Sequence, residues 1–268
     1  MIRAVCYSHI GKRLNHEDNF WLNGTIIEAE LQNKMSKIQS VHYESSSMGE
    51  VNIYAVSDGM GGHNAGEAAS RICSRRIGEL SNKAQSCADI SELVLLLQTN
   101  IARINEEICS KSYEHKEMQG MGATLVILAV CGPDCAILNI GDSRAYYFDG
   151  VTLTQITKDN TEGQRMLDLG ILSRKELMNF PARKHLNRYM GYNEGGFVLQ
   201  ADVYYLHVKS GMVLLCSDGV TDSLTDYEIK NILLTERDIN YAGKKIMERA
   251  VTMQNADNAT VMLINIGR

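Results

Sequence analysis

The chain has 268 residues, of which 44% are hydrophobic and 22% are charged, as in an ordinary globular protein. Its formal net charge of −5 at pH 7 excludes a broad basic surface for nucleic acid. The longest apolar run is far shorter than the ~20 residues that a membrane-spanning helix needs. The seven cysteines are scattered without a C-x-x-C pair and the N-terminus has no signal-peptide core, so we expect a cytoplasmic protein that contacts no membrane.

Apolar and β-branched segments predict the strands, and apolar residues at three- and four-residue spacing predict the helices. In chain order, strands are expected at residues 2–7, 52–56, 124–130, 136–140, 212–216 and 260–266, and helices at 66–80, 90–109 and 239–250. Two long helices follow one another and several strands run consecutively, so the order is not a regular β-α-β alternation. This order favours an α+β fold built from antiparallel sheets.

Two segments fit neither pattern. Residues 28–50 are polar, with three consecutive serines, and we expect an excursion from the fold or a long hairpin. Residues 158–194 are interrupted by Gly170, Pro181 and Gly191, and loops of that length are usually functional or mobile. Since no linker rich in proline or serine divides the chain, we expect residues 1–268 to form one domain.

Three of the predicted strands end in an aspartate. Asp58 and Asp218 each follow an apolar strand within a Ser-Asp-Gly sequence, and Asp142 follows a third strand within Gly-Asp-Ser-Arg. Because a buried strand fixes the position of its last residue, these carboxylates should be held in place. We expect the glycine after Asp58 or Asp218 to allow a sharp turn and to expose its carbonyl oxygen as a ligand.

Further acids accompany these three. Asp257 directly precedes the last strand, Asp222 lies four residues after the second Ser-Asp-Gly aspartate, and Glu17 and Asp18 follow Arg13 closely. Carboxylates gathered in one place repel one another and take up protons unless cations neutralise them. A turn explains any single Asp-Gly pair, whereas the whole set indicates a metal site. Oxygen ligands favour Mg²⁺ or Mn²⁺, since zinc would call for His or Cys.

Six short motifs, in this order along the chain, resemble those of the type 2C metal-dependent Ser/Thr protein phosphatases. They are Arg13-x-x-x-Glu17-Asp18, Asp58-Gly59-Met60-Gly61-Gly62-His63 with Gly66-Glu67, Gly120-Met121-Gly122-Ala123-Thr124-Leu125, Gly141-Asp142-Ser143-Arg144-Ala145-Tyr146, Ser217-Asp218-Gly219-x-x-Asp222 and Asp257-Asn258-x-Thr260. The resemblance covers essentially the whole chain. The Asp-Gly-Met-Gly-Gly-His form is similar to the compact bacterial branch of the family.

The resemblance implies a fold and a metal centre. The fold would be a sandwich of two antiparallel β-sheets flanked by α-helices on both sides, with the active site at one end. Asp58 would bridge two metal ions and the carbonyl oxygen of Gly59 would ligate one of them. Asp218 and Asp257 would ligate the other ion.

The resemblance also assigns the remaining acids. Glu17 and Asp18 would hold metal-bound waters, and Asp142 and Asp222 would help to form the site of a weaker third ion. The implied cofactor is therefore two or three Mn²⁺ or Mg²⁺ ions. Arg13 would bind the substrate phosphate, because its planar guanidinium matches phosphoryl oxygens.

The implied activity is hydrolysis of phosphoserine and phosphothreonine in proteins by direct attack of a metal-bridging hydroxide. Phosphorylated proteins would be the partners, with a Ser/Thr kinase and its substrates as the signalling context in bacterial relatives. The alternative is a pseudophosphatase that binds phosphoproteins without hydrolysing them. Such proteins typically lose metal aspartates, whereas Asp58, Asp218 and Asp257 are all present.

The chain departs from the family pattern at several places. Met60 stands where animal relatives carry a histidine thought to protonate the leaving group, which leaves the general acid open. Residues 28–50 form a longer stretch than in compact relatives. Asn160 and Phe180 replace frequent histidines within residues 158–194, so the departures concern substrate choice rather than the metal ligands.

Overall fold

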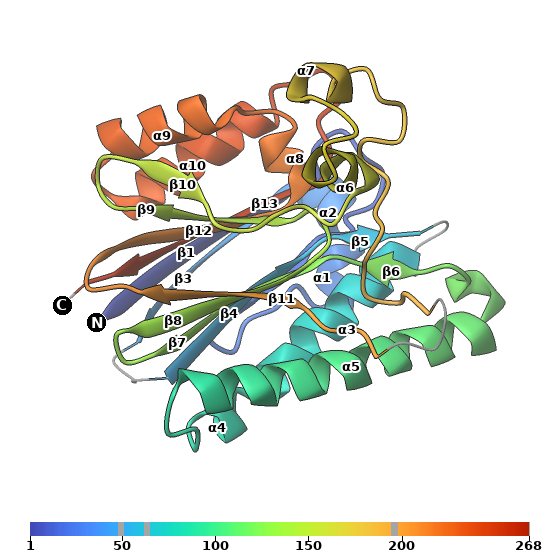
Figure 1. Cartoon of the computed structure of the whole chain (residues 1–268), viewed down its shortest axis with the longest axis horizontal. Coiled ribbons are helices and arrows are strands. Elements are labelled where there is room, and N and C mark those ends of the chain that lie inside the picture. The colour runs from blue at the N-terminus through green and yellow to red at the C-terminus, as the bar shows by residue number, and fades with distance from the viewer. Residues whose placement is uncertain (48–50, 62–64, 194–197, 268) are drawn as a thin grey trace.

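The computed structural model describes residues 1–47, 51–61, 65–193 and 198–267. Two antiparallel sheets lie face to face (Figure 1). The first has the strand order β10 (Leu153–Gln155), β9 (Arg144–Phe148), β12 (Gly211–Cys216), β13 (Ala259–Ile266), β1 (Ile2–His9) and β3 (Ser40–Ser47). The second has the order β11 (Asp202–His207), β8 (Asp134–Ile140), β7 (Leu125–Cys131), β4 (Val51–Ser57) and β2 (Asn19–Leu22). The expected sandwich of antiparallel sheets is thus confirmed.

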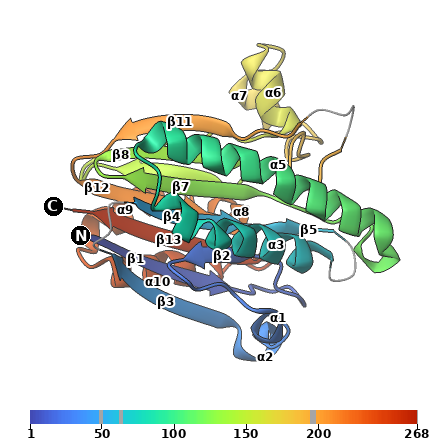
Figure 2. The same cartoon turned by 90° about the horizontal axis from the view of Figure 1, so that it is seen from below.

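Helices cover the outer face of each sheet. The second sheet is covered by α3 (Ala65–Glu79) and α5 (Ile90–Glu114), as Figure 2 shows. The short α4 (Ser81–Ala84) and η1 (Lys116–Met118) follow α3 and α5 in the chain. The first sheet is covered by α8 (Asp218–Thr221), α9 (Asp226–Thr235) and α10 (Ile239–Ala250). These helices make the sandwich a four-layered structure in which the inner strands of both sheets are buried on two faces.

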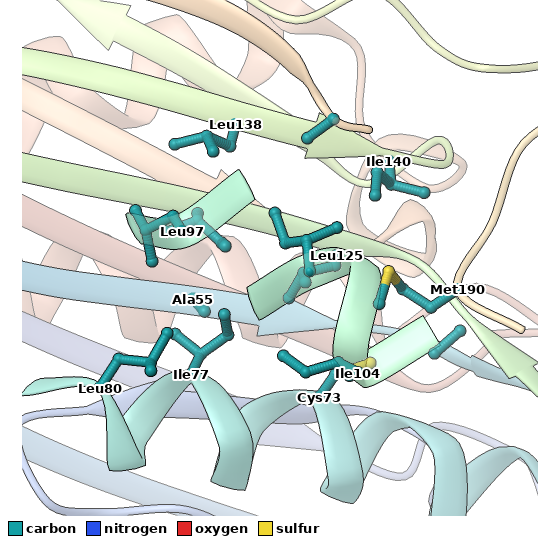
Figure 3. Packing of buried hydrophobic residues seen from close by; sticks show 14 of the residues in the cluster. Ala55, Cys73, Ile77, Leu80, Leu97, Ile104, Leu125, Leu138, Ile140 and Met190 are labelled. Atoms are coloured by element: carbon teal, nitrogen blue, oxygen red, sulfur yellow. The ribbon is translucent and has the colours of Figure 1, made fainter. Parts of the chain in front are cut away.

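The period-2 alternation of the strands distributes their side chains between these layers. In β7, Ile127 packs towards α3 and α5, and its neighbour Leu128 packs between the sheets. Figure 3 shows the outer of these two layers, where Ile77 of α3 and Leu97 of α5 meet Leu125. Because both faces of the inner strands are apolar, these strands appear in the sequence as continuous hydrophobic runs.

The sequence pattern placed the long elements well and the edge strands poorly. Helix α10 has the predicted bounds, whereas α5 continues five residues beyond the predicted end at residue 109. Its polar last turns carry no apolar stripe, although most of their residues are compatible with a helix. The strands β2, β3, β9, β10 and β11 were not predicted, because strands at or next to a sheet edge are short or bury only part of their side chains.

Of the two alternatives predicted for residues 28–50, the described residues 28–47 form the excursion and not the long hairpin. They contain α1 (Ala29–Gln32), α2 (Met35–Ile38) and β3, which pairs with β1 in the first sheet. The next strand along the chain, β4, belongs to the second sheet. The excursion therefore adds an edge strand to the sandwich, and Tyr43 of β3 packs its ring against Phe20 at a centroid distance of 5.6 Å.

Residues 158–194, which we call the flap, leave the end of the sandwich and return to it. Their described part, up to residue 193, carries α6 (Glu162–Asp168) and α7 (Arg174–Leu177). At the start of the flap, the backbone N–H of Asn160 donates to the carbonyl of Gly141 at 2.8 Å, and the Asn160 side chain accepts from Gly141 N–H at 2.9 Å. At its end, Met190 and Ala123 exchange two backbone hydrogen bonds of 2.7 and 3.0 Å. Both ends are thereby fixed beside the strand ends.

Among the described helices, none combines the length and the apolar character that a membrane crossing requires.

Candidate metal centre

A pocket of about 700 Å³ opens at the end of the sandwich where the predicted acids meet. Five acids line it, namely Glu17, Asp58, Asp142, Asp218 and Asp257. Each lies within two residues of the end of a different strand: β4, β8 and β12 end at this edge, and β2 and β13 begin there. In an antiparallel pair the start of one strand lies beside the end of its neighbour, so acids before and after strands are brought together.

Thr124 holds the first of these acids in place. The backbone N–H of Asp58 donates to Thr124 Oγ1 at 2.9 Å, and Thr124 N–H donates to the carbonyl of Asp58 at 2.8 Å. The Thr124 hydroxyl also lies 2.6 Å from the hydroxyl of Ser143, next to Asp142. One buried threonine therefore fixes the positions of two acids from different strands.

The chain turns at Gly219, as expected, where the N–H of Val220 donates to the carbonyl of Ser217 at 3.3 Å as β12 passes into α8. Gly59 instead continues into the short strand β5 (Gly59–Met60). What the two glycines share is close packing. Neither Gly59 nor Gly219 has a positive φ. A Cβ on Gly59 would lie 2.1 Å from the carbonyl oxygen of Gly66, and one on Gly219 would lie 2.0 Å from that of Asn258. The backbone after each aspartate thus lies directly against a neighbouring segment that also carries part of the site.

Asp18 lies behind the pocket and is fully buried. Its Oδ2 accepts two hydrogen bonds of 2.7 Å, from the hydroxyls of Ser217 and Thr260. Its Oδ1 has no hydrogen-bond partner within the described ranges. A buried carboxylate oxygen without a partner is costly, and a cation or a water held by a cation would satisfy it.

Burial raises the pKa of the central carboxyls. Desolvation raises the pKa of Asp58 well above its usual value, and the charges of Asp18, Asp218 and Asp142 raise it further. Desolvation, followed by the charge of Asp222, likewise raises the pKa of Asp218. Burial is likewise the main cause that raises the pKa of Asp18, Asp142 and Glu17, each to about 7.

The outer acids are paired with cations of the chain itself. Asp257 forms an ion pair with Arg13, and Asp222 forms one with Lys184 of the flap. Asp222 lies in a smaller adjoining pocket of about 200 Å³ that Asp142 and Asp218 also line. As the side chains stand, no three His, Cys, Asp or Glu residues in the described ranges are arranged to hold an ion.

The residues nevertheless fit divalent cations chemically. All the donors are carboxylate or carbonyl oxygens, which hard cations such as Mg²⁺ and Mn²⁺ prefer. The raised pKa values mean that the centre needs positive charge before all its acids can ionise, and Asp18 Oδ1 offers a free acceptor. Gly62 and His63 of the second motif lie outside the described residues.

Sequence reasoning gave no role to several residues around the site. Asn258 is the most informative: its Oδ1 accepts from Glu17 N–H at 2.7 Å, and its Nδ2 donates to the carbonyls of Ile10 and Asn15. It therefore fixes the loop that carries Arg13. The Asp-Asn sequence marked Asn258 as part of a motif. Only the fold shows that its side-chain amide forms hydrogen bonds with the segment from residue 10 to residue 17.

The chain matches known proteins over most of its length. Residues 40–254 match the family model described as "Protein phosphatase 2C". The serine/threonine phosphatase stp of Listeria monocytogenes is 32% identical over 213 residues, which are 79% of this chain and 83% of that protein. The serine/threonine protein phosphatase PstP of Mycobacterium tuberculosis is 29% identical over 83% of this chain and 42% of its own length.

Solved structures are similar over nearly the whole chain. The serine/threonine phosphatase Stp1 of Staphylococcus aureus aligns with a TM-score of 0.80 and 27% identity, covering 99% of this chain and 95% of that one. The catalytic domain of PstP in complex with two manganese ions aligns with a TM-score of 0.75 and 25% identity, covering 99% and 100% of the two chains.

The raised pKa values predict a pH-dependent stability of the chelator-treated protein. Acids with a folded-state pKa near 7 and an unfolded pKa near 4 stabilise the fold at low pH, and this contribution is lost as the pH rises through about 7. We expect Tm to fall by at least about 4 °C between pH 5.5 and 8.5, and Mn²⁺ to raise Tm more at pH 8.5. Calorimetry in EDTA checks this. The Asp142→Asn variant is the control, because it lacks one of these acids and its Tm should depend less on pH. A Tm that is independent of pH would contradict the electrostatics given above.

Proposed function

The chain belongs to the protein phosphatase 2C family, and from that premise we propose how its residues divide the work of the reaction. It is a metal-dependent hydrolase that removes phosphate from phosphoserine and phosphothreonine of proteins. One observation supports the assignment of its site above all others. Five acids from five strand ends line a single pocket, and burial raises the pKa of most of them.

We assign two divalent cations to this pocket. Asp58, which is half-buried in the lining, would be shared by them, with the carbonyl oxygen of Gly59 on one ion. Asp218 and Asp257 would bind the other ion from the first sheet. Glu17 and Asp18 would hold waters around them, and the unpartnered Oδ1 of Asp18 supports that role.

When bound, the cations supply positive charge that acidifies a water molecule and neutralises the phosphoryl oxygens. The protein supplies position. Arg13 lies at the pocket with its guanidinium largely exposed and held by Asp257, so it can bind phosphoryl oxygens in a bidentate manner. Thr124 and the two close-packed glycines keep Asp58 and Asp218 from moving when their charges change. This preorganisation lowers the reorganisation that the transition state requires.

We propose a third, weaker cation site in the adjoining pocket, formed by Asp142, Asp218 and Asp222. Lys184 already places an ammonium group on Asp222. An ion at this site would have to displace that group, which is a physical reason for weak binding. The same contact joins the flap to the first sheet, so occupation of the third site and the position of the flap would be linked.

We further propose that residues 1–268 act as one catalytic domain whose substrates are cytoplasmic phosphoproteins of a Ser/Thr kinase. The seven cysteines include no C-x-x-C pair, which supports a reducing compartment. The flap supports selection among phosphoproteins, since Lys184, His185 and Tyr189 line the same pocket as Arg13. Cationic groups from the flap and from the loop of Arg13 would favour a doubly ionised phosphomonoester.

Asp58→Asn should lower kcat for a phosphothreonine peptide by at least about 10³-fold, because the amide cannot neutralise two cations. The fold should persist, since the Asp58 backbone keeps its bonds to Thr124. Manganese-dependent phosphate release measures the loss. Asp134→Asn is the matched control, because Asp134 lies at the opposite end of β8, where its exposed side chain pairs with His207. Wild-type turnover by Asp58→Asn would remove its bridging role.

Arg13→Ala should raise KM about 10- to 100-fold with a smaller change in kcat, because it removes a charge-assisted pair of hydrogen bonds to the phosphate. Mn²⁺ affinity should be retained or rise, since Asp257 loses its competing partner. Steady-state kinetics together with calorimetric Mn²⁺ titration separate the two effects. The neighbouring Lys12→Ala, whose side chain does not line the pocket, should leave KM unchanged. An unaltered KM in Arg13→Ala would show that the phosphate binds elsewhere.

Asp142→Ala and Lys184→Met should change the affinity of the third site for Mn²⁺ in opposite directions. The first removes a carboxylate of the adjoining pocket, and the second removes the cation that occupies Asp222. We expect only the weakest step of a Mn²⁺ titration to weaken in Asp142→Ala and to strengthen in Lys184→Met, each by about tenfold. Lys175→Met, on α7, serves as a flap control. Loss of all Mn²⁺ binding in Asp142→Ala would contradict the assignment.

A further inference from the structure

A line of buried hydrogen bonds leads from Asp18 away from the pocket. The hydroxyl of Thr260, which donates to Asp18 Oδ2, lies 2.7 Å from the hydroxyl of Ser8. That hydroxyl in turn lies 2.8 Å from Nε2 of His16. All the side chains on this line are at most 1% exposed. The line runs from Asp18 through β13 and β1 to the loop that carries Arg13. Its two ends, Asp18 and His16, are only two residues apart in the sequence.

The proton positions on this line follow from Asp18. An ionised carboxylate can only accept, so the Thr260 hydroxyl must donate its single proton to Asp18 Oδ2. The proton between Thr260 and Ser8 then has to come from Ser8. With its own proton used, Ser8 can only accept from His16, so Nε2 of the imidazole carries hydrogen. Nδ1 is left as a bare acceptor, and it has no partner within the described residues.

The opposite tautomer of His16 would break the line. A bare Nε2 would take the Ser8 proton, and Ser8 would then need the Thr260 proton. Oxygens of Thr260 and Asp18 would face one another at 2.7 Å without hydrogen between them. Two acceptors in contact in a dry interior are strongly unfavourable. The Nε2–H tautomer of His16 is therefore the one that lets every contact on the line, as far as the ionised Asp18, carry a hydrogen.

We infer that His16 is a positioning residue of the metal centre: its Nε2–H, acting through Ser8 and Thr260, holds Asp18 so that Oδ2 faces the protein and Oδ1 stays free for the cations or their water. The inference rests on the proposed function, in which Asp18 holds water around the cations. Ser217 supports the same orientation, because its hydroxyl donates to Oδ2 and accepts from Thr260 N–H at 2.9 Å. Outer hydrogen bonds of this kind orient ligands and set their basicity.

Calorimetric titration of Mn²⁺ into the chelator-treated protein tests this line of hydrogen bonds, which we call the relay, without any substrate. Ser8→Ala removes the middle of the line, and His16→Leu removes its origin. Each should weaken Mn²⁺ binding about 10- to 100-fold. His16→Gln can keep a donor near the position of Nε2 and should restore most of the affinity. Ile264→Val, a one-methyl truncation on the strand of Thr260, matches the loss of stability without touching the line.

The outcomes separate the relay from the centre. If Ser8→Ala and Ile264→Val bind Mn²⁺ equally well, the inference is wrong while the metal centre stands. If the wild-type protein binds no Mn²⁺, the proposed centre fails and the relay with it. Weakened binding in Ser8→Ala and His16→Leu, with recovery in His16→Gln, is the result expected from a directed donor and not from packing alone.

A measurement on the wild-type protein avoids the risk that a His16 variant does not fold. Nitrogen-15 spectra of the histidine rings, recorded with diamagnetic Mg²⁺, report which ring nitrogen carries hydrogen. We expect His16 as the Nε2–H form, with the Ser8→Ala protein used to assign its signals. An Nδ1–H form of His16 in the Mg²⁺-loaded protein would reverse the line and overturn the inference.

Discussion

The mutual repulsion of carboxylates is the constraint around which this protein is built. Asp18, Asp58, Asp142 and Asp218 are buried close enough that each raises the free energy of ionising another. A loose chain would separate them or bind their protons. The sandwich prevents separation, because each acid adjoins a strand that is packed on both faces and cannot shift without disrupting an apolar layer. Cations are then the remaining way to ionise the whole set.

The same constraint explains why so much of the surrounding polar structure is backbone or hydroxyl. Thr124, Ser217 and Thr260 hold aspartates with neutral donors that add no charge to the centre. Charged partners of the centre's acids lie at the rim, where Arg13 and Lys184 pair with the more exposed Asp257 and Asp222. Solvent screens those outer pairs, so they can exchange with a substrate phosphate or an added ion. Rigid neutral contacts inside and exchangeable ionic contacts outside suit a centre that must bind and release phosphate repeatedly.

The flap is attached to this centre at both ends. Asn160 binds Gly141 directly before Asp142, and Met190 pairs with Ala123 directly before Thr124. Its helices α6 and α7 stand beyond the sandwich (Figure 1), while Lys184 reaches back to Asp222. A change of flap position would therefore be felt first by Asp142 and Asp222. The departures from the family pattern at Asn160 and Phe180 lie in this segment, and Asn160 acts as one of its anchors.

The sequence by itself determined the fold class, the main strands and helices, and the acids that gather at one end. It could do so because strands buried on both faces leave long apolar runs, and because Asp58, Asp142 and Asp218 directly follow such runs. Only the tertiary structure decided that Gly59 and Gly219 serve close approach, that β3 joins the first sheet, and that His16 controls Asp18 through Ser8 and Thr260. These features depend on strand register between residues up to 252 positions apart, and local sequence carries no record of which side chains that register brings within hydrogen-bond distance.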